Sequence, residues 1–366
     1  MKLAVPKETR PGERRVAITP DVVGLLKRAG LDVVVEYSAG RAAHFTDAEY
    51  QQAGAELAAD VWREADVLVK VQPPSAEEVM RLRAGAVLVS LLQPAANAER
   101  IAELAHRQVT ALALELLPRI SRAQKMDVLT SQATVAGYLA ALMAAQRLSK
   151  FFPMLMTAAG TIPPAKVLVL GAGVAGLQAI ATARRLGALV WGYDVRPVVK
   201  EQVESLGAKF LQFELATKET QDAGGYAREL SAEDKARQQA WLAEKTREFD
   251  VVISTALIPG KPAPRLITRA TVEAMRPGSV IVDLAAEAGG NCEVTRPGED
   301  VEHHGVWVLG PINVPSQMPT HASQMFARNV TELVRLLVKD GKLASDFNDE
   351  IIKAMCVTHE GKVMRT

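Results

Sequence analysis

Cysteine, aromatic residues and excess charge are scarce in this sequence, and each shortage excludes a class of protein. Its two cysteines, Cys292 and Cys356, lie far apart with no Cys-x-x-Cys pair, which favours free thiols in a reducing, cytoplasmic setting. Aromatic residues make up 5% of the chain, too few for a base-stacking surface, and the net charge is only +1. Nucleic-acid binding normally needs a basic excess, so we expect no nucleic-acid partner. We also expect no bound metal.

Long apolar runs are missing as well. The first seven residues have neither the apolar core nor the cleavage site of a signal peptide. The most apolar helical stretch, residues 128–146, contains several hydroxyl and amide side chains, and we predict that it is too polar to span a bilayer alone. These absences predict a soluble protein.

What the sequence does contain is an alternation of short apolar runs with helical patterns. A chain of 366 residues exceeds one usual core, so we expect two domains. One series of strands is predicted at 2–5, 32–37, 66–71, 86–90 and 110–114, and a second at 166–170, 189–194, 208–211, 250–255, 279–283 and 306–309. Amphipathic helices intervene, for example at 20–29 and 174–186. This order predicts an α/β fold with two Rossmann-like domains and mostly parallel sheets.

The predicted domain boundaries follow from the same pattern. We assign residues 1–132 and 327–366 to a first α/β domain, and residues 133–326 to a second that binds a dinucleotide. Two long helical patterns, 131–149 and 321–340, are expected to cross between the domains and to leave a cleft between them.

A dinucleotide site is predicted where residues 171–176 read Gly-Ala-Gly-Val-Ala-Gly, between a strand and a helix. Gly171 would permit the tight turn, Gly173 would let the backbone approach a pyrophosphate, and Gly176 would let helix and strand pack closely. The helix N-terminus, which begins at Val174, then faces the phosphates. The surrounding strand and helix make this motif more specific than glycine spacing alone.

The residues after the next strand predict which dinucleotide binds. Asp194 ends that strand, where its carboxylate can accept hydrogen bonds from both ribose hydroxyls. A carboxylate repels a 2′-phosphate, so we expect NAD(H) rather than NADP(H), with Val195 also at the site. Arg196 complicates this prediction because an arginine there can bind the 2′-phosphate.

Three further segments leave alternatives open. The loops at 254–262 and 283–291 follow strands, and each is as well explained by a rigid turn as by cofactor contact. The charge-rich segment 217–248 is explained equally well by a solvated helical insertion or by a mobile lid built on Gly224, Gly225 and Tyr226.

The sequence resembles a known family over its whole length. Residues 5–10 and 14–20 resemble the shared start of alanine dehydrogenases and of the NAD(H)-binding domain I of proton-translocating NAD(P) transhydrogenases. Residues 119–132 look like the transhydrogenase version, and the run Gly-Gly-Tyr-Ala at 224–227 resembles that family's mobile loop. The resemblance implies an NAD(H)-binding component of such an enzyme, present as a separate soluble subunit.

The resemblance also implies site residues. By position, Arg119, Gln124 and Asp127 match residues that hold the nicotinamide carboxamide and fix its rotation, with Arg119 paired to Asp127. Without the resemblance, this pair would be explained equally well as a structural ion pair. Tyr226 matches the tyrosine that folds over the site, and we expect these four residues to act in catalysis. The other cofactor contacts that the resemblance implies are Lys125, Met126, Thr130, which replaces the usual serine, Gly225 and Leu257.

Two alternatives differ from transhydrogenation in the chemistry they need. An alanine-dehydrogenase-like enzyme must move protons, so it needs an acid/base beside the substrate. Lys70 stands at the position of that family's lysine, but Gln93 stands at the position of its histidine and cannot exchange a proton. A pure NAD-binding regulator would need no carboxamide clamp. Hydride transfer between two nicotinamides needs no general base, only two rings held in contact.

Partners are implied by the resemblance alone. They are a second copy of the chain, a membrane-spanning subunit, and a subunit that carries NADP(H), with hydride transfer coupled to proton translocation by the membrane subunits. The sequence ends at Thr366 without a membrane helix, so we expect the membrane component to be a separate subunit. The chain itself is expected to be cytoplasmic and peripheral on the inner face of the cell membrane.

Overall fold

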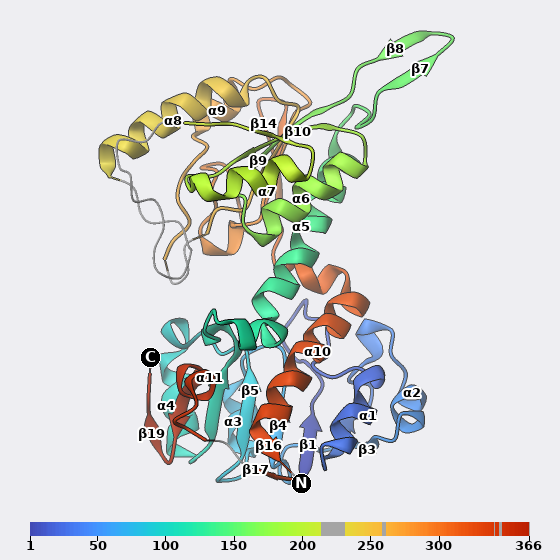
Figure 1. Cartoon of the computed structure of the whole chain (residues 1–366), viewed down its shortest axis with the longest axis vertical. Coiled ribbons are helices and arrows are strands. Elements are labelled where there is room, and N and C mark those ends of the chain that lie inside the picture. The colour runs from blue at the N-terminus through green and yellow to red at the C-terminus, as the bar shows by residue number, and fades with distance from the viewer. Residues whose placement is uncertain (214–230, 258–260, 340, 344–345, 366) are drawn as a thin grey trace. The chain divides into compact units, whose positions relative to one another are not determined.

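The computed structural model describes residues 1–213, 231–257, 261–339, 341–343 and 346–365 (Figure 1). The chain divides into two compact units, one of Met1–Gln132 with Pro315–Thr366 and the other of Ala133–Val314. Each unit has a mostly parallel sheet with helices on both faces, so the predicted fold class is confirmed.

The first unit is built on an eight-stranded sheet. Its six parallel strands stand in the order β3-β2-β1-β4-β5-β6, and β18 and β19 extend the β6 edge in antiparallel fashion. The strands are β1 (Lys2–Val5), β2 (Asp32–Glu36), β3 (Glu56–Ala58), β4 (Val67–Val69), β5 (Val87–Ser90), β6 (Thr110–Ala113), β18 (Cys356–His359) and β19 (Lys362–Val363). The chain therefore starts in the centre of this sheet and ends at its edge.

Successive side chains of β1 point to opposite faces of the sheet and pack into two separate cores in the first unit. Leu3 and Val5 pack into one, whereas Ala4 between them packs into the other. The first core is covered by α1 (Pro20–Arg28), α2 (Asp47–Gln52), α10 (Pro319–Leu337) and α11 (Glu350–Met355), and the second by α3 (Ala76–Arg81) and α4 (Ala98–His106).

The second unit repeats the doubly wound order. Its sheet runs β11-β10-β9-β12-β13-β15, the strand order of dinucleotide-binding Rossmann domains, with β14 antiparallel at the outer edge. The strands are β9 (Lys166–Leu170), β10 (Leu189–Tyr193), β11 (Lys209–Phe210), β12 (Val251–Ser254), β13 (Val280–Asp283), β14 (Asp300–His303) and β15 (Val306–Leu309). The order reverses between β9 and β12, and ligands of such sheets bind at that point.

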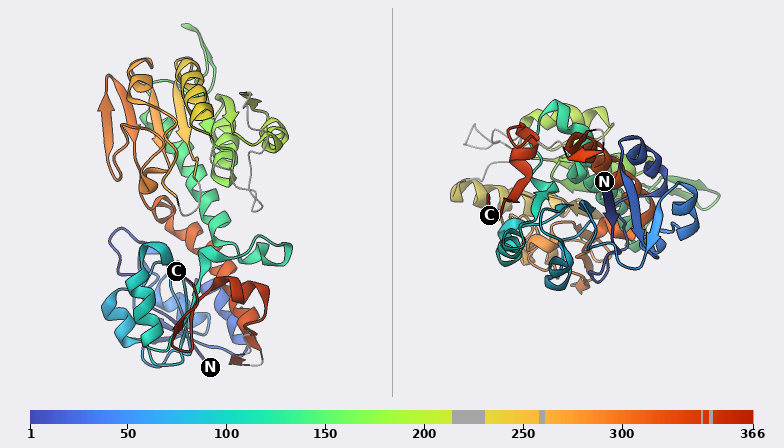
Figure 2. Two further views of the ribbon diagram at one scale, coloured as in Figure 1. Left: turned by 90° about the vertical axis from the view of Figure 1, so that its left-hand side faces the viewer. Right: turned by 90° about the horizontal axis from the view of Figure 1, so that it is seen from below.

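Helices cover both faces of the second sheet. The helices α5 (Val128–Arg147), α6 (Val174–Arg185) and α7 (Lys200–Ser205) pack on one face, and α8 (Ala232–Thr246) and α9 (Arg269–Glu273) on the other (Figure 2). Leu242 of α8 is fully buried, and Gln238 donates a hydrogen bond to the Tyr193 hydroxyl at 2.8 Å. The second half of the charge-rich segment is therefore a helix that is anchored on one side, not solvated all round.

A two-stranded hairpin of β7 (Leu155–Thr157) and β8 (Gly160–Ile162) projects from the second unit (Figures 1 and 2). The sequence pattern did not predict it, nor the short strands β3, β14, β18 and β19. The edge strands β3, β14 and β19 are short and partly exposed, so they leave little hydrophobic signal and escape prediction from periodicity.

The two long helices have different roles. The chain passes between the units inside α5, whereas α10 lies wholly in the first unit because Phe326, Ala327 and Val330 are buried in its core. The crossing that was expected in 321–340 therefore occurs earlier, at Pro315.

Helix α5 is also more apolar than its hydroxyl and amide side chains suggested. Its length and mean hydropathy of 1.4 meet the requirements of a membrane span, and 44% of the apolar window is buried. Ala140, Ala141 and Ala144 on this helix are fully buried in the core of the second unit. Packing within the protein thus accounts for the buried part of this apolar helix.

Candidate functional site

The glycine loop after β9 has the geometry that the motif predicts. Gly171 has φ +94°, and a Cβ there would lie 2.8 Å from Thr255 Oγ1. A Cβ on Gly176 would lie 1.8 Å from the Gly171 carbonyl oxygen, so only glycine fits. Beside Gly173, by contrast, no described atom lies within 4 Å of a Cβ. The first and third glycines serve packing, and the second leaves the free approach that a pyrophosphate needs.

Gly137 is a contributor to this loop that was not predicted from the sequence. It lies on α5, and a Cβ there would sit 2.0 Å from the carbonyl oxygen of Ala175, inside the glycine motif. The sequence did offer a signal for this contact, namely a glycine inside a helix with no role in a cap or turn. Such a residue lowers helix stability, so close packing is the usual reason for its presence.

The substitution Gly137→Ala should therefore push α5 away from the glycine loop. We expect it to cost about 1–3 kcal/mol of stability and to weaken NADH binding several-fold. The matched control is Gly24→Ala in α1, where the nearest atom is Arg28 Nη1 at 3.7 Å and a neutral or stabilising effect is expected. Thermal unfolding and NADH titration of both variants test this, and wild-type values for Gly137→Ala would contradict the contact.

Asp194 lies directly after β10 and contacts the glycine loop. Its Oδ2 accepts a hydrogen bond from the Ala172 amide at 2.8 Å. Arg196 binds both carboxylate oxygens, from Nε to Oδ1 at 2.8 Å and from Nη2 to Oδ2 at 2.7 Å. The structure thus pairs the two residues whose expected effects on cofactor choice oppose each other. Val195, between them, is half-buried.

The loops after β12 and β13 are held together by buried polar side chains. Asp283 accepts hydrogen bonds from Ser254 Oγ at 3.0 Å and from Thr295 Oγ1 at 2.7 Å. Asn291 donates to the carbonyl oxygens of Ala256 and Pro264. These contacts favour a structural turn for both loops, with Leu257 left 46% exposed at the β12 edge.

The predicted cofactor residues from Gln124 to Thr130 lie on the first unit, in the 3-10 helix η4 (Ser121–Met126) and the start of α5. Gln124 and Lys125 are exposed, Met126 is half-buried, and Arg119 is exposed just before η4. Asp127 caps α5, because its Oδ1 accepts the Thr130 amide at 2.9 Å and its Oδ2 accepts the Thr130 hydroxyl at 2.7 Å. The Thr130 hydroxyl, at the position of the usual serine, is therefore hydrogen-bonded to Asp127.

Two contacts from the C-terminal segment hold η4 in place. Arg122 binds the Asp349 carboxylate at 2.8 and 3.0 Å, and Asn329 on α10 donates to the Lys125 carbonyl oxygen at 2.7 Å. The hydrogen bonds that Asp349 accepts from Arg122 lower the pKa of the Asp349 carboxyl group. Buried Ala123 and Val128 anchor the same turn in the core. Arg122, Asn329 and Asp349 were not predicted, because they are too distant along the chain to be paired by spacing.

Lys70 is buried and paired rather than free to meet a substrate. It is 1% exposed, and its Nζ lies 2.7 Å from Glu78 and 3.7 Å from Glu8. Burial raises the pKa of Glu8 to about 7, although Lys70 opposes that rise. Gln93, at the position of the alanine dehydrogenase histidine, has φ +49° and is exposed. Gln93 therefore offers no group that exchanges a proton, and Lys70 is taken up by a buried ion pair.

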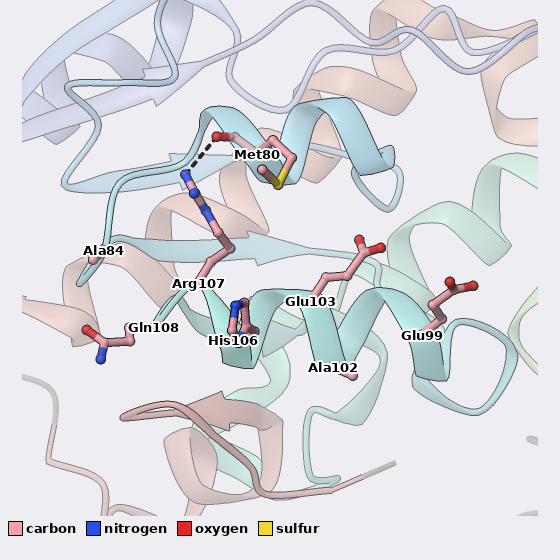
Figure 3. Close-up of a pocket in the computed structure, with 8 residues that line it drawn as sticks. All are labelled: Met80, Ala84, Glu99, Ala102, Glu103, His106, Arg107 and Gln108. Atoms are coloured by element: carbon pink, nitrogen blue, oxygen red, sulfur yellow. Dashed lines mark hydrogen bonds between the residues drawn. The ribbon is translucent and has the colours of Figure 1, made fainter.

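A shallow pocket of about 670 Å³ lies between α3 and α4 (Figure 3). Its lining includes Met80, Glu103, His106 and Arg107, and Arg107 donates a hydrogen bond to the Met80 carbonyl oxygen at 2.7 Å. Of the predicted site residues that the structure describes, none lines it. Gly224, Gly225 and Tyr226, and with them the predicted lid, lie outside the described residues.

Comparisons with known proteins agree with these features. The family models described as alanine dehydrogenase/PNT, N-terminal domain and C-terminal domain match residues 4–136 and 140–366. The first portion of NAD(P) transhydrogenase subunit alpha of Rhodospirillum rubrum is 49% identical, over 100% of this chain and 98% of that protein. Alanine dehydrogenase of Halomonas elongata is 33% identical, over 99% of this chain and 94% of the relative.

Among the solved structures too, the transhydrogenase is more similar to this chain than the alanine dehydrogenase is. The crystal structure of transhydrogenase from Sinorhizobium meliloti has a TM-score of 0.87 and 45% identity, over 99% of this chain and 98% of that one. An L-alanine dehydrogenase structure has a TM-score of 0.82 and 28% identity, over 99% and 96%. The chain therefore belongs to the alanine dehydrogenase/PNT family and, within it, to the NAD(P) transhydrogenase alpha subunits, which are oxidoreductases that bind NAD(H).

Proposed function

We propose that this chain passes hydride directly between its own NAD(H) and an NADP(H) held by a partner component, in a proton-translocating transhydrogenase. The observation that carries the proposal is the chemistry of the two described residues at the positions where an amino-acid dehydrogenase needs an acid and a base. Gln93 cannot exchange a proton, and Lys70 is buried and held in an ion pair with Glu78 at 2.7 Å. The dinucleotide loop is nevertheless complete, with the two glycines that packing requires and free approach at Gly173.

Each group of residues has its own task in this proposal. Residues 171–176 receive the pyrophosphate, and Asp194 holds the adenosine ribose. Arg119, Gln124 and Asp127 orient the nicotinamide carboxamide. The bound nucleotide supplies or accepts the hydride, so the protein needs only to position it and exclude water. Gln124 is exposed, and the contacts of Arg122 with Asp349 and of Lys125 with Asn329 hold the turn that carries it. Both properties suit a residue that contacts a second nucleotide from a fixed position.

Two assays test the proposal together. With alanine and NAD⁺, or with pyruvate, ammonia and NADH, the purified chain should show no turnover. When the NADP(H)-binding component is added, the same preparation should transfer hydride between NAD(H) and NADP(H). Robust alanine oxidation by the chain alone would overturn the proposal in favour of an alanine-dehydrogenase-like enzyme.

The proposal includes a membrane location through partners. The name of the relatives, subunit alpha, implies further subunits. We propose that these include an NADP(H)-binding and a membrane-spanning subunit, which place this chain on the inner face of the cell membrane.

A homodimer is also included in the proposal, and the β7–β8 hairpin is the surface that supports it. Met154, Met156 and Ile162 are 56%, 76% and 42% exposed on this arm. A lone two-stranded hairpin is only marginally stable in water, and exposed apolar side chains on both of its faces favour a protein contact.

In sedimentation experiments, Met156→Asp should therefore shift the chain from dimer towards monomer. The matched control is Met80→Asp, since Met80 is 64% exposed on α3 in the other unit. If Met156→Asp sediments as the wild type does, the hairpin is not the dimer contact.

A further inference from the structure

Three side chains of the second unit converge away from the dinucleotide loop. His303 Nε2 lies 2.9 Å from Glu273 Oε1, and His304 Nε2 lies 3.9 Å from the same oxygen. The two imidazole rings are 4.7 Å apart between centroids. One nitrogen from each histidine and one oxygen from Glu273 all lie within 4.8 Å of one another.

The backbone explains why two successive histidines face one carboxylate. His303 is the last residue of β14 and pairs with Val306, the first residue of β15, so only His304 and Gly305 form the turn. Both turn residues have positive φ, +50° and +76°, as in the tight turns that suit the twist of a hairpin. Neighbouring strand residues normally point to opposite faces, but the left-handed conformation of His304 turns its ring back beside His303. Glu273 completes the group from the last position of α9.

We propose that His303, His304 and Glu273 form a binding site for one divalent transition-metal ion of the zinc type. Zinc takes imidazole nitrogens at about 2.0–2.1 Å and carboxylate oxygens at about 2.0–2.2 Å, so donors around a tetrahedral ion lie about 3.3 Å apart. The two distances from Glu273, 2.9 and 3.9 Å, bracket that spacing. Two imidazoles and one carboxylate suit zinc, nickel or copper better than calcium or magnesium.

The charges around the cluster have opposing effects on a cation. The Glu273 carboxylate attracts a cation, and its Oε1 lies at hydrogen-bond distance, 2.9 Å, from His303 Nε2. The Arg269 guanidinium opposes a metal ion, because its Nη1 lies 3.4 Å from His303 Nε2. Arg269 is exposed, so its side chain can swing into solvent when the ion binds.

The topology separates this site from the dinucleotide site. The turn at His304 precedes β15, whereas the glycine loop follows β9, and these strands run parallel in the same sheet. The two sites therefore lie at opposite ends of the parallel strands. A metal ion held by His303 and His304 should leave NADH affinity unchanged.

The test is a zinc titration of the full chain without a polyhistidine tag, in competition with a chromogenic chelator. We expect one equivalent of Zn²⁺ to bind tightly, and His304→Ala or Glu273→Gln to weaken it about 10- to 100-fold or more. Arg269→Gln should tighten binding several-fold because it removes the opposing charge. Binding should also weaken on acidification, because protons and the metal ion compete for the same imidazole nitrogens.

The matched control is His106→Ala, which removes an exposed histidine from α4 in the other unit and should leave Zn²⁺ binding unchanged. Cobalt provides a second probe, because its visible absorption reports the number and type of ligands. The proposal is overturned if a His303→Ala/His304→Ala variant binds Zn²⁺ as the wild type does, or if His106→Ala loses as much affinity as His304→Ala.

Discussion

Replacing Gln124 with asparagine should slow single-turnover hydride transfer to the NADP(H)-binding component about 10- to 100-fold, with NADH affinity within a few-fold of wild type. Direct transfer requires two nicotinamide carbons near contact, and a displacement of about 1 Å costs about 100-fold in rate. Asparagine keeps the amide but shortens the side chain by one methylene. The loss should therefore fall on positioning and not on binding, most of which comes from residues 171–176 and Asp194.

The anchors of η4 allow a sharper version of this experiment. Asp349→Asn removes the charge that binds Arg122 but keeps an N-cap for α11, where the Ile351 amide donates to Asp349 Oδ1 at 2.9 Å. It should slow transfer by less than Gln124→Asn does and leave NADH affinity unchanged. The control is Gln51→Asn, which makes the same chemical change as Gln124→Asn at an exposed position of α2. It should have no effect. If Gln124→Asn loses NADH affinity while transfer stays fast, Gln124 is a binding group and not a positioning residue.

Removing the Asp194 carboxylate should reduce the preference for NADH over NADPH about 10- to 100-fold, the value of a hydrogen bond to a charged group. In the structure Arg196 is bound to Asp194 through both carboxylate oxygens. Asp194→Ala therefore removes the ribose acceptor and also breaks the bidentate pairing that holds the Arg196 guanidinium, a group that can bind a 2′-phosphate. NADH affinity should fall and NADPH affinity should rise.

A second variant separates these two effects. In Asp194→Ala/Arg196→Gln, NADH affinity should stay low while the gain for NADPH disappears. If alanine at position 194 disturbs the loop, Asp194→Asn replaces it as the test variant. The asparagine side chain can still accept a hydrogen bond from the Ala172 amide. Calorimetric titration with both nucleotides measures each affinity. An unchanged ratio of NADH to NADPH affinity in Asp194→Ala would show that this residue does not select the cofactor.

The sequence could predict the parts of the site that are formed by residues close together along the chain. A strand, a glycine loop and a helix follow one another between β9 and α6, so their residues meet whatever surrounds them. The strongly apolar central strands were predicted for the same reason, and β1, β9 and β15 have the predicted bounds. Edge strands such as β3 and β14 were missed because half-exposed residues carry a weak pattern.

The family resemblance identified Arg119, Gln124 and Asp127 but could not say what holds them. The contacts of Arg122 with Asp349, and of Asn329 with Lys125, join segments more than two hundred residues apart. Gly137 under the glycine loop and Glu273 beside two histidines are closer in sequence to their neighbours, but those neighbours also come from other elements.

By itself, then, the sequence determined that this chain has two doubly wound α/β units and a dinucleotide loop with a carboxylate at the next strand end. Those features depend on local periodicity and on short spacings, which the chain imposes before it folds. Only the tertiary structure decided that Asp194 is paired with Arg196, that buried Lys70 lies beside Glu8 and Glu78, and that His303 and His304 face Glu273. Such outcomes depend on side-chain direction and on how elements pack, which no spacing along the chain specifies.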